Sequence, residues 1–209
     1  MPTVLSRKSG GSGGGGAPSG PAGGDLGGTY PNPTLATGVG VFDLIENQTL
    51  GANAATIDFQ NIPATYNHLH VIGFLRGVQA ADSVELRVRM NNDSGNNYDD
   101  QYVAGANATL TGSARTGESS ALLGEIVAGN GNAGHGSPFM ADIPQYAGTT
   151  FEKMVLTEFG RMVADAAAGF NRGMSLGRWR NTAAITRITF LLSAGNFLAG
   201  SQLSLYGKG

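Results

Sequence analysis

Residues 84–90 read VELRVRM, and this stretch decides the fold class. Its four apolar residues, from Val84 to Met90, alternate with charged residues. A period of two is typical of a β-strand that buries one face and leaves the other in water. The stretch runs directly into NNDSGNN at 91–97, a turn composition that tolerates positive φ. A half-buried strand that ends in a turn favours an antiparallel sheet.

The regions on either side carry weaker versions of the same signal. Apolar and β-branched runs recur between clusters of glycine, asparagine and proline. Many short strands separated by turns predict an all-β fold, an antiparallel, jelly-roll-like β-sandwich. The alanine-rich stretch 158–170 leaves a helix open as an alternative there. We expect strands within 39–50 and at 56–59, 68–76, 84–90, 119–127, 137–143, 151–159, 174–181, 185–193 and 201–206.

Glycine and proline divide the chain into three parts. Many of the 34 glycines lie near the N-terminus, and residues 1–24 are expected to form an arm and a glycine-rich tether. Glycine this dense cannot offset the entropy that is lost on ordering. Residues 25–40 are expected to be a connector, in which Pro31 and Pro33 fix φ and predict a stiff, extended segment. Residues 41–209 are the expected sandwich domain.

Charge and composition exclude several classes of partner. The formal net charge is −2 and 13% of the residues are charged, so no basic surface is expected for nucleic acid. No run approaches the roughly 18 apolar residues of a membrane span, and no apolar segment follows Arg7 and Lys8 as a signal peptide requires. We therefore expect neither nucleic-acid binding nor membrane insertion. The chain has no cysteine, which excludes disulfides and thiolate metal sites.

Two groups of residues resemble known phage proteins. Residues 20–35 read GPAGGDLGGTYPNPTL, which is similar to an element near the start of many bacteriophage tail and fibre proteins. Residues 59–69 and 89–98, together with SLYG at 204–207, resemble a β-sandwich module of phage tail and head fibres. In that family such modules usually form homotrimers at the end of a thin stalk. The stalk is almost missing here, because the Pro-Asn-Pro element passes into the sandwich within a few residues.

The resemblance implies a structural, non-enzymatic virion protein, assembled in the cytoplasm of a bacterial host. It implies a trimeric tail fibre or spike subunit that attaches to a host-surface glycan or protein and needs no cofactor. A capsid (head) fibre or decoration protein without an essential receptor is the alternative, and a glycan-degrading spike is a third. Three copies are expected to pack Leu26, Tyr30 and Leu35 around a threefold axis. The alternative is a plain rigid linker with exposed side chains. The anchor to other tail or capsid proteins is expected at Val4, Leu5, Arg7 and Lys8.

Polar loops and one tryptophan are the candidate receptor contacts. Loops at the end of a rigid sandwich are where such scaffolds place recognition, although plain solvated turns would look the same. The Arg-Trp-Arg triplet at 178–180 has the composition of a binding hot spot, but a tryptophan in the core or at the trimer interface, with solvated arginines beside it, is the favoured interpretation. The candidates are Asn92, Asp93, Asn96, Asn97, Tyr98, Asp99, Asn130, Asn132, His135, Arg178, Trp179 and Arg180.

Metal and catalytic patterns are weak. His68 and His70 would share one face of a strand and, with His135, could make a three-histidine site, but surface histidines are the simpler interpretation. The acidic loop at 93–100 lacks the ligand order of an EF-hand, so a solvated turn is favoured over a calcium site. No pair of carboxylates can be nominated for glycoside hydrolysis from spacing alone. We predict no catalytic residue and no metal site.

Overall fold

The structure is a computed structural model that describes residues 19–24, 26–35, 42–106, 109–165 and 169–209. The chain divides into two compact units, residues 1–39 and 40–209. The elements of both units are β-strands, β1 to β16, all paired antiparallel. No helix in the described part of the chain is long and apolar enough to span a membrane.

The first unit contains two very small sheets within residues 20–35. One pairs β1 with β3 and places Gly20 opposite Tyr30, and the other pairs β2 with β4 and places Leu26 opposite Leu35. Ala22 N donates to Gly28 O at 3.0 Å across the first sheet. The strands are β1 (Gly20–Pro21), β2 (Leu26–Gly27), β3 (Thr29–Tyr30) and β4 (Thr34–Leu35).

The prediction of a stiff, extended connector is therefore wrong for the described residues. The chain reverses repeatedly between 20 and 35, and Asn32 N donates to Thr29 O at 3.2 Å across the turn that contains Pro31. The reversals use glycines with positive φ, such as Gly24 at 69° and Gly28 at 80°. Glycine adopts that region without steric cost, so it permits turns that the prolines alone do not suggest.

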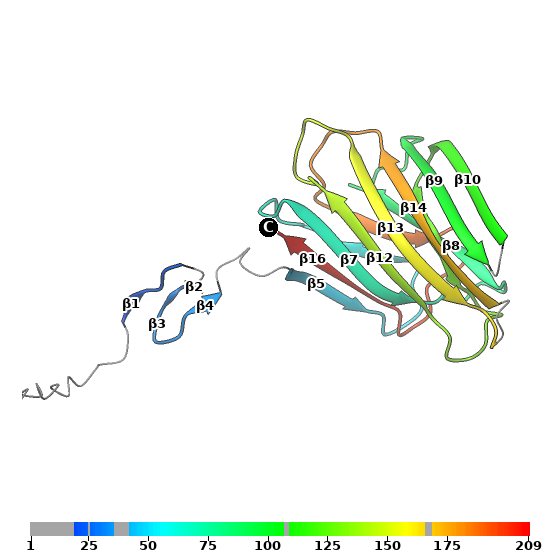
Figure 1. The fold of residues 1–209 in the computed structure, drawn as a ribbon, viewed down its shortest axis with the longest axis horizontal. Coiled ribbons are helices and arrows are strands. Elements are labelled where there is room, and N and C mark those ends of the chain that lie inside the picture. The colour runs from blue at the N-terminus through cyan, green and yellow to red at the C-terminus, as the bar shows by residue number, and fades with distance from the viewer. Residues whose placement is uncertain (1–18, 25, 36–41, 107–108, 166–168) are drawn as a thin grey trace, which may run out of the picture. The chain divides into compact units, whose positions relative to one another are not determined.

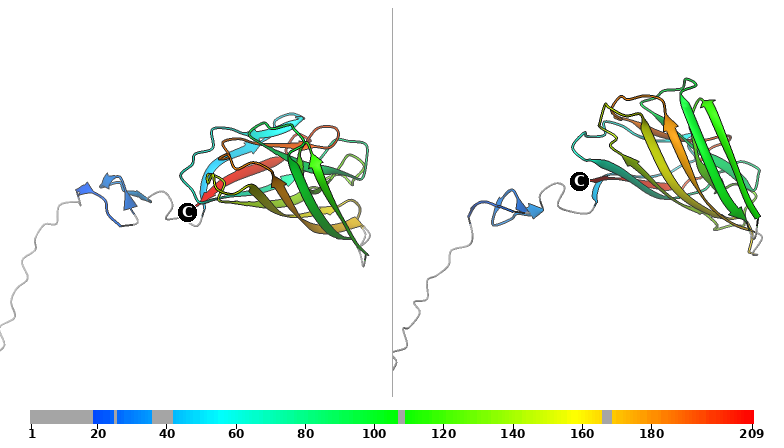
Figure 2. Two further views of the ribbon diagram at one scale, coloured as in Figure 1. Left: turned by 90° about the horizontal axis from the view of Figure 1, so that it is seen from above. Right: turned by 45° about the horizontal axis from the view of Figure 1, so that its top comes forward.

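The second unit consists of two antiparallel sheets. The larger has eight strands in the order β10-β9-β14-β13-β12-β7-β16-β5, which run side by side in Figure 1. The smaller has four, in the order β11-β8-β15-β6, and Figure 2 shows the unit from two further directions. The strands are β5 (Asp43–Thr49), β6 (Thr56–Phe59), β7 (His68–Leu75), β8 (Ser83–Met90), β9 (Tyr98–Ala106), β10 (Thr109–Glu118), β11 (Ala121–Val127), β12 (Ser137–Pro144), β13 (Lys153–Met162), β14 (Phe170–Trp179), β15 (Ile188–Leu192) and β16 (Gln202–Lys208).

The all-β prediction is confirmed, and β8 coincides with the stretch that decided it. Val84, Leu86, Val88 and Met90 are all buried. No strand is predicted at 98–118, where the structure has β9 and β10, because β10 is a mostly exposed edge strand without apolar alternation. The jelly-roll detail stays a prediction.

The helix alternative at 158–170 is wrong for the residues described there. Residues up to Met162 continue β13, and Phe170 begins β14. The reason is the alternation from Lys153 to Phe159, which buries every second side chain. Packing of that face against the smaller sheet outweighs the helix propensity of the alanines that follow.

Aromatic side chains from both sheets meet in the core. Phe139 of the larger sheet lies edge-on to Phe190 of the smaller sheet, with ring centroids 6.1 Å apart. Phe59 of β6 makes a second edge contact with Phe190 at 6.2 Å. Such edge-to-face pairs add to the free energy gained by burying the rings.

Glycines let the two sheets approach each other next to these rings. A Cβ atom on Gly124 of β11 would lie 2.3 Å from the ring of Phe159 in β13, and one on Gly177 of β14 would lie 2.9 Å from Ala121. Distances this short do not occur between real atoms in contact, so both sites require glycine. The sheets are therefore closest where β11 crosses β13 and β14.

Candidate functional site

The antiparallel register places the loops of the sandwich at its two ends. We call the end at which the chain enters β5 at Asp43 the proximal end; β7, β9 and β13 also begin there. The distal end is the opposite one, where β7 ends at Leu75 beside Ser137 of β12. Loop 91–97 leads into β9 at the proximal end, and loop 129–136 leads into β12 at the distal end. The two candidate loops therefore lie at opposite ends.

The proximal loop is organised around the carboxylate of Asp93. It accepts hydrogen bonds from Trp179 Nε1 at 2.7 Å, Asn97 Nδ2 at 2.9 Å and Gly95 N at 2.8 Å. Burial raises the pKa of Asp93, but these hydrogen bonds outweigh it and hold the pKa below its usual value. Asp93 therefore ties the loop to the end of β14 instead of presenting its charge outward.

Two of the candidate contact residues belong to the core. Tyr98 is 0% exposed and Trp179 is 3% exposed. The Tyr98 hydroxyl accepts from Met90 N at 2.9 Å and donates to Asp93 O at 3.1 Å, and burial raises its pKa to about 12. The prediction that Tyr98 and Trp179 contact a receptor is wrong, because strand alternation turns both side chains inward.

Asp99 forms a cluster with the two neighbouring arginines. Arg180 donates from Nε at 2.8 Å and from Nη2, and Arg178 donates from Nη1 at 3.2 Å. Hydrogen bonding from Arg180 is the largest cause of the lowered pKa of Asp99. Arg178 also donates to Glu152 at 2.5 Å. Both arginines point outward as alternation predicts, yet they are already engaged by carboxylates.

Asn91 is a structural residue of this loop that the sequence argument missed. Its amide oxygen accepts from Thr186 N and Arg187 N, and its nitrogen donates to Ala184 O at 2.8 Å. Asn91 and Asn92 both have positive φ, 49° and 60°, which asparagine tolerates better than most residues. Of the proximal candidates, Asn92, Asn96 and Asn97 are exposed.

One arginine binds three backbone carbonyls of the distal loop. Arg76, just after β7, donates to the backbone carbonyls of Gly131 at 2.6 Å, Asn132 at 2.8 Å and His135 at 2.8 Å. A guanidinium group has donors on a rigid planar fork and can bind several carbonyls at once. Nothing in the local sequence links Arg76 to a loop more than fifty residues away, so only the fold reveals this contact.

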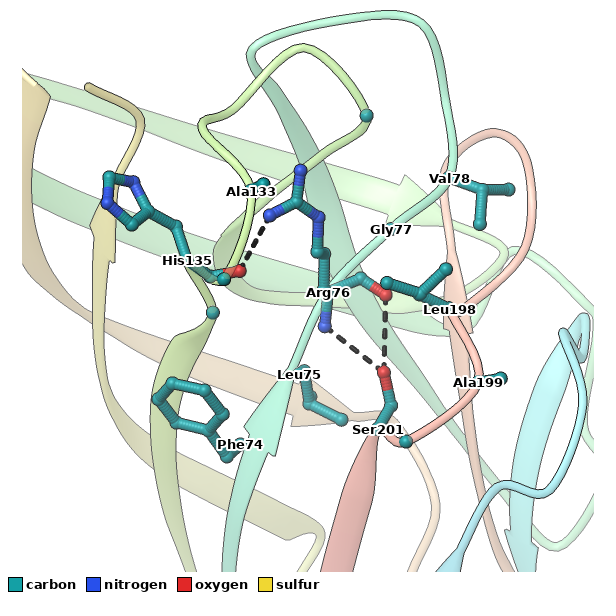
Figure 3. A pocket seen from close by; sticks show the side chains of 14 residues that line it. Phe74, Leu75, Arg76, Gly77, Val78, Ala133, His135, Leu198, Ala199 and Ser201 are labelled. Carbon is teal, nitrogen blue, oxygen red and sulfur yellow. Dashed lines mark hydrogen bonds between the residues drawn. The ribbon is translucent and has the colours of Figure 1, made fainter.

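A cavity of about 570 Å³ opens beside Arg76 (Figure 3). Its wall combines apolar side chains, such as Phe74 and Leu198, with glycine backbone. A Cβ on Gly136 would lie 2.1 Å from the Phe74 ring, so that ring packs directly on the loop backbone. Ser201 Oγ accepts from Arg76 N at 3.2 Å and closes the floor. Concave apolar walls with a few polar groups are typical of ligand-binding sites.

Of the three distal candidates, His135 lines this cavity, whereas Asn130 and Asn132 belong to the same loop but are not among the lining residues. Asp165, from the β13–β14 connection, accepts from Asn132 Nδ2 at 2.7 Å and lies 2.9 Å from His135 Nε2. Figure 3 shows the His135 ring turned away from Arg76 and Leu198. Asn130 is exposed. Asn130 is therefore the candidate whose amide is most open to an outside partner at this end.

His68, His70 and Asp100 each contact a different partner. His68 and His70 share one face, but His68 Nδ1 accepts from Gln145 N at 3.2 Å whereas His70 Nδ1 lies 2.9 Å from Asp142. Asp100 pairs with Arg115 at 3.0 Å. Among the described residues, no three His, Cys, Asp or Glu side chains come together in a way that could hold a metal ion.

The candidate anchor residues and the candidate trimer residues of the N-terminal part differ in what the structure describes. Val4, Leu5, Arg7 and Lys8 lie outside the described residues. Leu26 and Tyr30 are half-buried within the first unit, and the backbone of Leu26 is paired with that of Leu35. The trimer contacts proposed for them stay a prediction.

With this geometry in place, the chain was compared with known proteins. No family model, no curated protein and no solved structure matches it.

Proposed function

We propose that this chain is a structural protein of a bacteriophage virion, a homotrimeric tail fibre or spike subunit. Its sandwich attaches the particle to a glycan or protein of the host surface. Three copies per fibre convert weak single-site binding into useful avidity, because the second and third contacts become intramolecular.

The order of the parts carries this proposal. The element at 20–35, whose sequence resembles the start of phage tail and fibre proteins, forms a small unit of its own. The sandwich that follows begins at Asp43, and its cavity lies at the opposite end of its strands. A protein that is anchored through its N-terminus meets an outside partner with the end away from that anchor. The distal loop and its cavity are therefore the favoured contact.

The chemistry of the distal end suits a neutral ligand. Asn130 offers an amide, Leu198 offers an apolar side chain that is 37% exposed, and Gly134 and Gly200 leave backbone uncovered by side chains. A sugar ring or an extended peptide presents the same mixture of apolar faces and hydrogen-bonding groups. Three N–H donors of the Arg76 guanidinium are taken by backbone carbonyls, which leaves fewer of them for direct hydrogen bonds to an anionic ligand.

Attachment is favoured over glycan cleavage by the composition of this cavity. Glycosidases need two carboxyl groups on opposite sides of the scissile bond. No Asp or Glu is among the residues that line the distal cavity. Asp165, the acid that contacts the distal loop, is engaged with Asn132 and His135.

Adsorption competition tests the proposal. The full chain is mixed with host cells before phage is added, and the adsorption rate is measured against protein concentration. We expect the wild-type chain to slow adsorption. Asn130→Arg and Leu198→Asp, both at the distal end, should each require about tenfold more protein, which corresponds to ~1.4 kcal/mol of binding free energy.

The matched control is Asn96→Arg, an exposed asparagine at the proximal end, and it should compete as the wild type does. If the wild-type chain does not slow adsorption at any concentration, the attachment role is wrong and a capsid fibre or decoration role replaces it. Antibody labelling of particles would then place the chain on the capsid and not on the tail tip.

A further inference from the structure

The outer face of the eight-stranded sheet is apolar where a sheet exposed to water is usually polar. Register aligns Val103, Met174, Glu158, Met140 and Ile72 in one row across β9, β14, β13, β12 and β7. All five side chains point away from the core, because their neighbours along each strand are the buried ones. Four of the five residues in this row are apolar.

The next row along the strands repeats the pattern. Leu176 and Leu156 lie opposite each other on β14 and β13, and Asp142 and His70 continue the row on β12 and β7. Tyr206 of β16 follows beside His70. The apolar side chains are thus contiguous across two rows, with the greatest density on β13 and β14.

The exposed apolar area is comparable to that of a protein interface. Nine outward side chains on five neighbouring strands are each 38–57% exposed. Together they expose several hundred Å², on the order of the ~800 Å² that each partner contributes to a standard interface. They are Ile72, Phe74, Val103, Met140, Met154, Leu156, Phe170, Met174 and Leu176.

The outer face also contains grooves into which side chains of a partner can pack. Two adjoining grooves of about 480 Å³ each lie on it and share Met140 and Glu158 in their walls. One groove contains Leu156 and Met174, and the other contains Phe170. Methionine side chains adapt to the shape of a partner, so grooves lined by them suit packing against a second apolar surface.

The acidic side chains near the centre of this face each have a partner on the face itself. Glu158 lies 3.1 Å from Arg172, and His70 lies 2.9 Å from Asp142. Few unpartnered acidic groups would therefore meet when two copies of the face approach each other. A polyanion or a strongly charged partner finds no complementary field here.

We propose that this outer face, defined by the nine side chains above, is the surface through which copies of this chain associate. The occupant is a second copy, because the area matches what an interface needs and the charge pattern is compatible with itself. The inference rests on the trimer in the proposed function and deepens it, since it locates the contact on the sandwich itself. It assigns to Leu156 and Met174 the centre of the interface.

The oligomeric state of the full chain tests the inference. We expect sedimentation velocity to show a trimer for the wild type and a monomer for Leu156→Asp and for Met174→Asp at the same concentration. Both substitutions lie outside the core, so the far-ultraviolet circular dichroism should be unchanged. Leu198→Asp is the matched control, because Leu198 is a similarly exposed apolar residue on the distal loops, and it should remain a trimer.

A thiol-protection experiment keeps the inference falsifiable if an aspartate variant fails to fold. The chain has no cysteine, so Met174→Cys introduces a single thiol at the centre of the proposed interface. Its reaction with a bulky maleimide should be at least tenfold slower than that of Leu198→Cys, and urea should abolish the difference.

The outcomes separate this inference from the proposed function. A monomeric wild type would overturn both the trimer and the interface. A trimeric wild type whose Met174→Cys reacts as fast as Leu198→Cys would overturn the interface alone. Loss of adsorption competition in the Leu198→Asp trimer would concern only the attachment site.

Discussion

The two faces of the eight-stranded sheet are built by the same strands and both carry large apolar side chains, but they differ in how those side chains are packed. On the inner face, Phe139 and Phe159 are buried against β11 and β15 of the smaller sheet, and glycines make room for the rings. On the outer face, Leu156 and Met174 remain about half exposed. Apolar character alone therefore does not identify the core; the presence of a matching second layer does.

Truncation of a large side chain should give the largest difference in stability between the inner and the outer face. Phe159→Ala removes a ring that stacks on Tyr102 at 5.6 Å and fills the space over Gly124. We expect a loss of about 3–5 kcal/mol in the free energy of unfolding, measured with urea at one protein concentration. Both variants are made in the monomeric Leu156→Asp background, which leaves the outer face free, and there Phe170→Ala, the matched control, should cost well under half as much. Equal losses would mean that the two faces are packed alike.

Addition of a single methyl group should give a smaller difference in stability between the two faces. Gly177→Ala places a Cβ 2.8 Å from Val155 and 2.9 Å from Ala121 between the sheets, and overpacking of this kind costs about 1–3 kcal/mol. Gly160→Ala on the outer face meets nothing closer than Pro138 at 3.5 Å. Its melting temperature should be nearly that of the wild type. A large drop for Gly160→Ala would show that the outer face is crowded.

The outer face of the smaller sheet differs from the outer face of the larger sheet. It carries charged pairs, whereas the outer face of the larger sheet carries apolar side chains. Asp58 accepts from Arg187 at 2.8 and 2.6 Å and from Thr189 at 2.6 Å. Burial raises the pKa of Asp58, but these hydrogen bonds outweigh it and lower the pKa below 3.8.

Because the folded pKa of Asp58 lies below the unfolded one, the stabilisation is complete above about pH 4. It is lost as the pH falls through the folded pKa. Asp58→Asn should therefore cost about 1–2 kcal/mol at pH 7, and the gap to wild type should shrink at pH 3. Urea unfolding at the two pH values measures it, and a gap that persists at pH 3 would contradict the assignment.

The same two faces explain what the sequence could predict. Strand β8 alternates cleanly because its outward side carries charges, and its position and burial follow directly. Strand β7 reads HLHVIGFL, and its outward Ile72 and Phe74 obscure the alternation that would separate its faces. Strand β10 carries small polar residues on both sides and gives no signal at all. Local pattern therefore identifies which face of a strand is buried only where the other face carries polar or charged side chains.

The candidate site was less predictable, for a related reason. Composition correctly marked the asparagine-rich loops as turns, but it could not show that Asp93 is bound to Trp179, 86 residues away in sequence. It also could not place the two loops at opposite ends, since that follows from strand register. Residues such as Arg76, which act through contacts distant in sequence, carry no local signature.

The contact made by Arg76 has a consequence for how the distal loop can change. Its three hydrogen bonds all go to main-chain carbonyl oxygens, at Gly131, Asn132 and His135. Every residue type supplies such an oxygen, so the anchor does not depend on which side chains the loop displays. Side chains such as Asn130 can then be exchanged while the loop keeps its course. Under the proposed attachment role, substitutions in this loop would change what it recognises and leave its attachment to Arg76 in place.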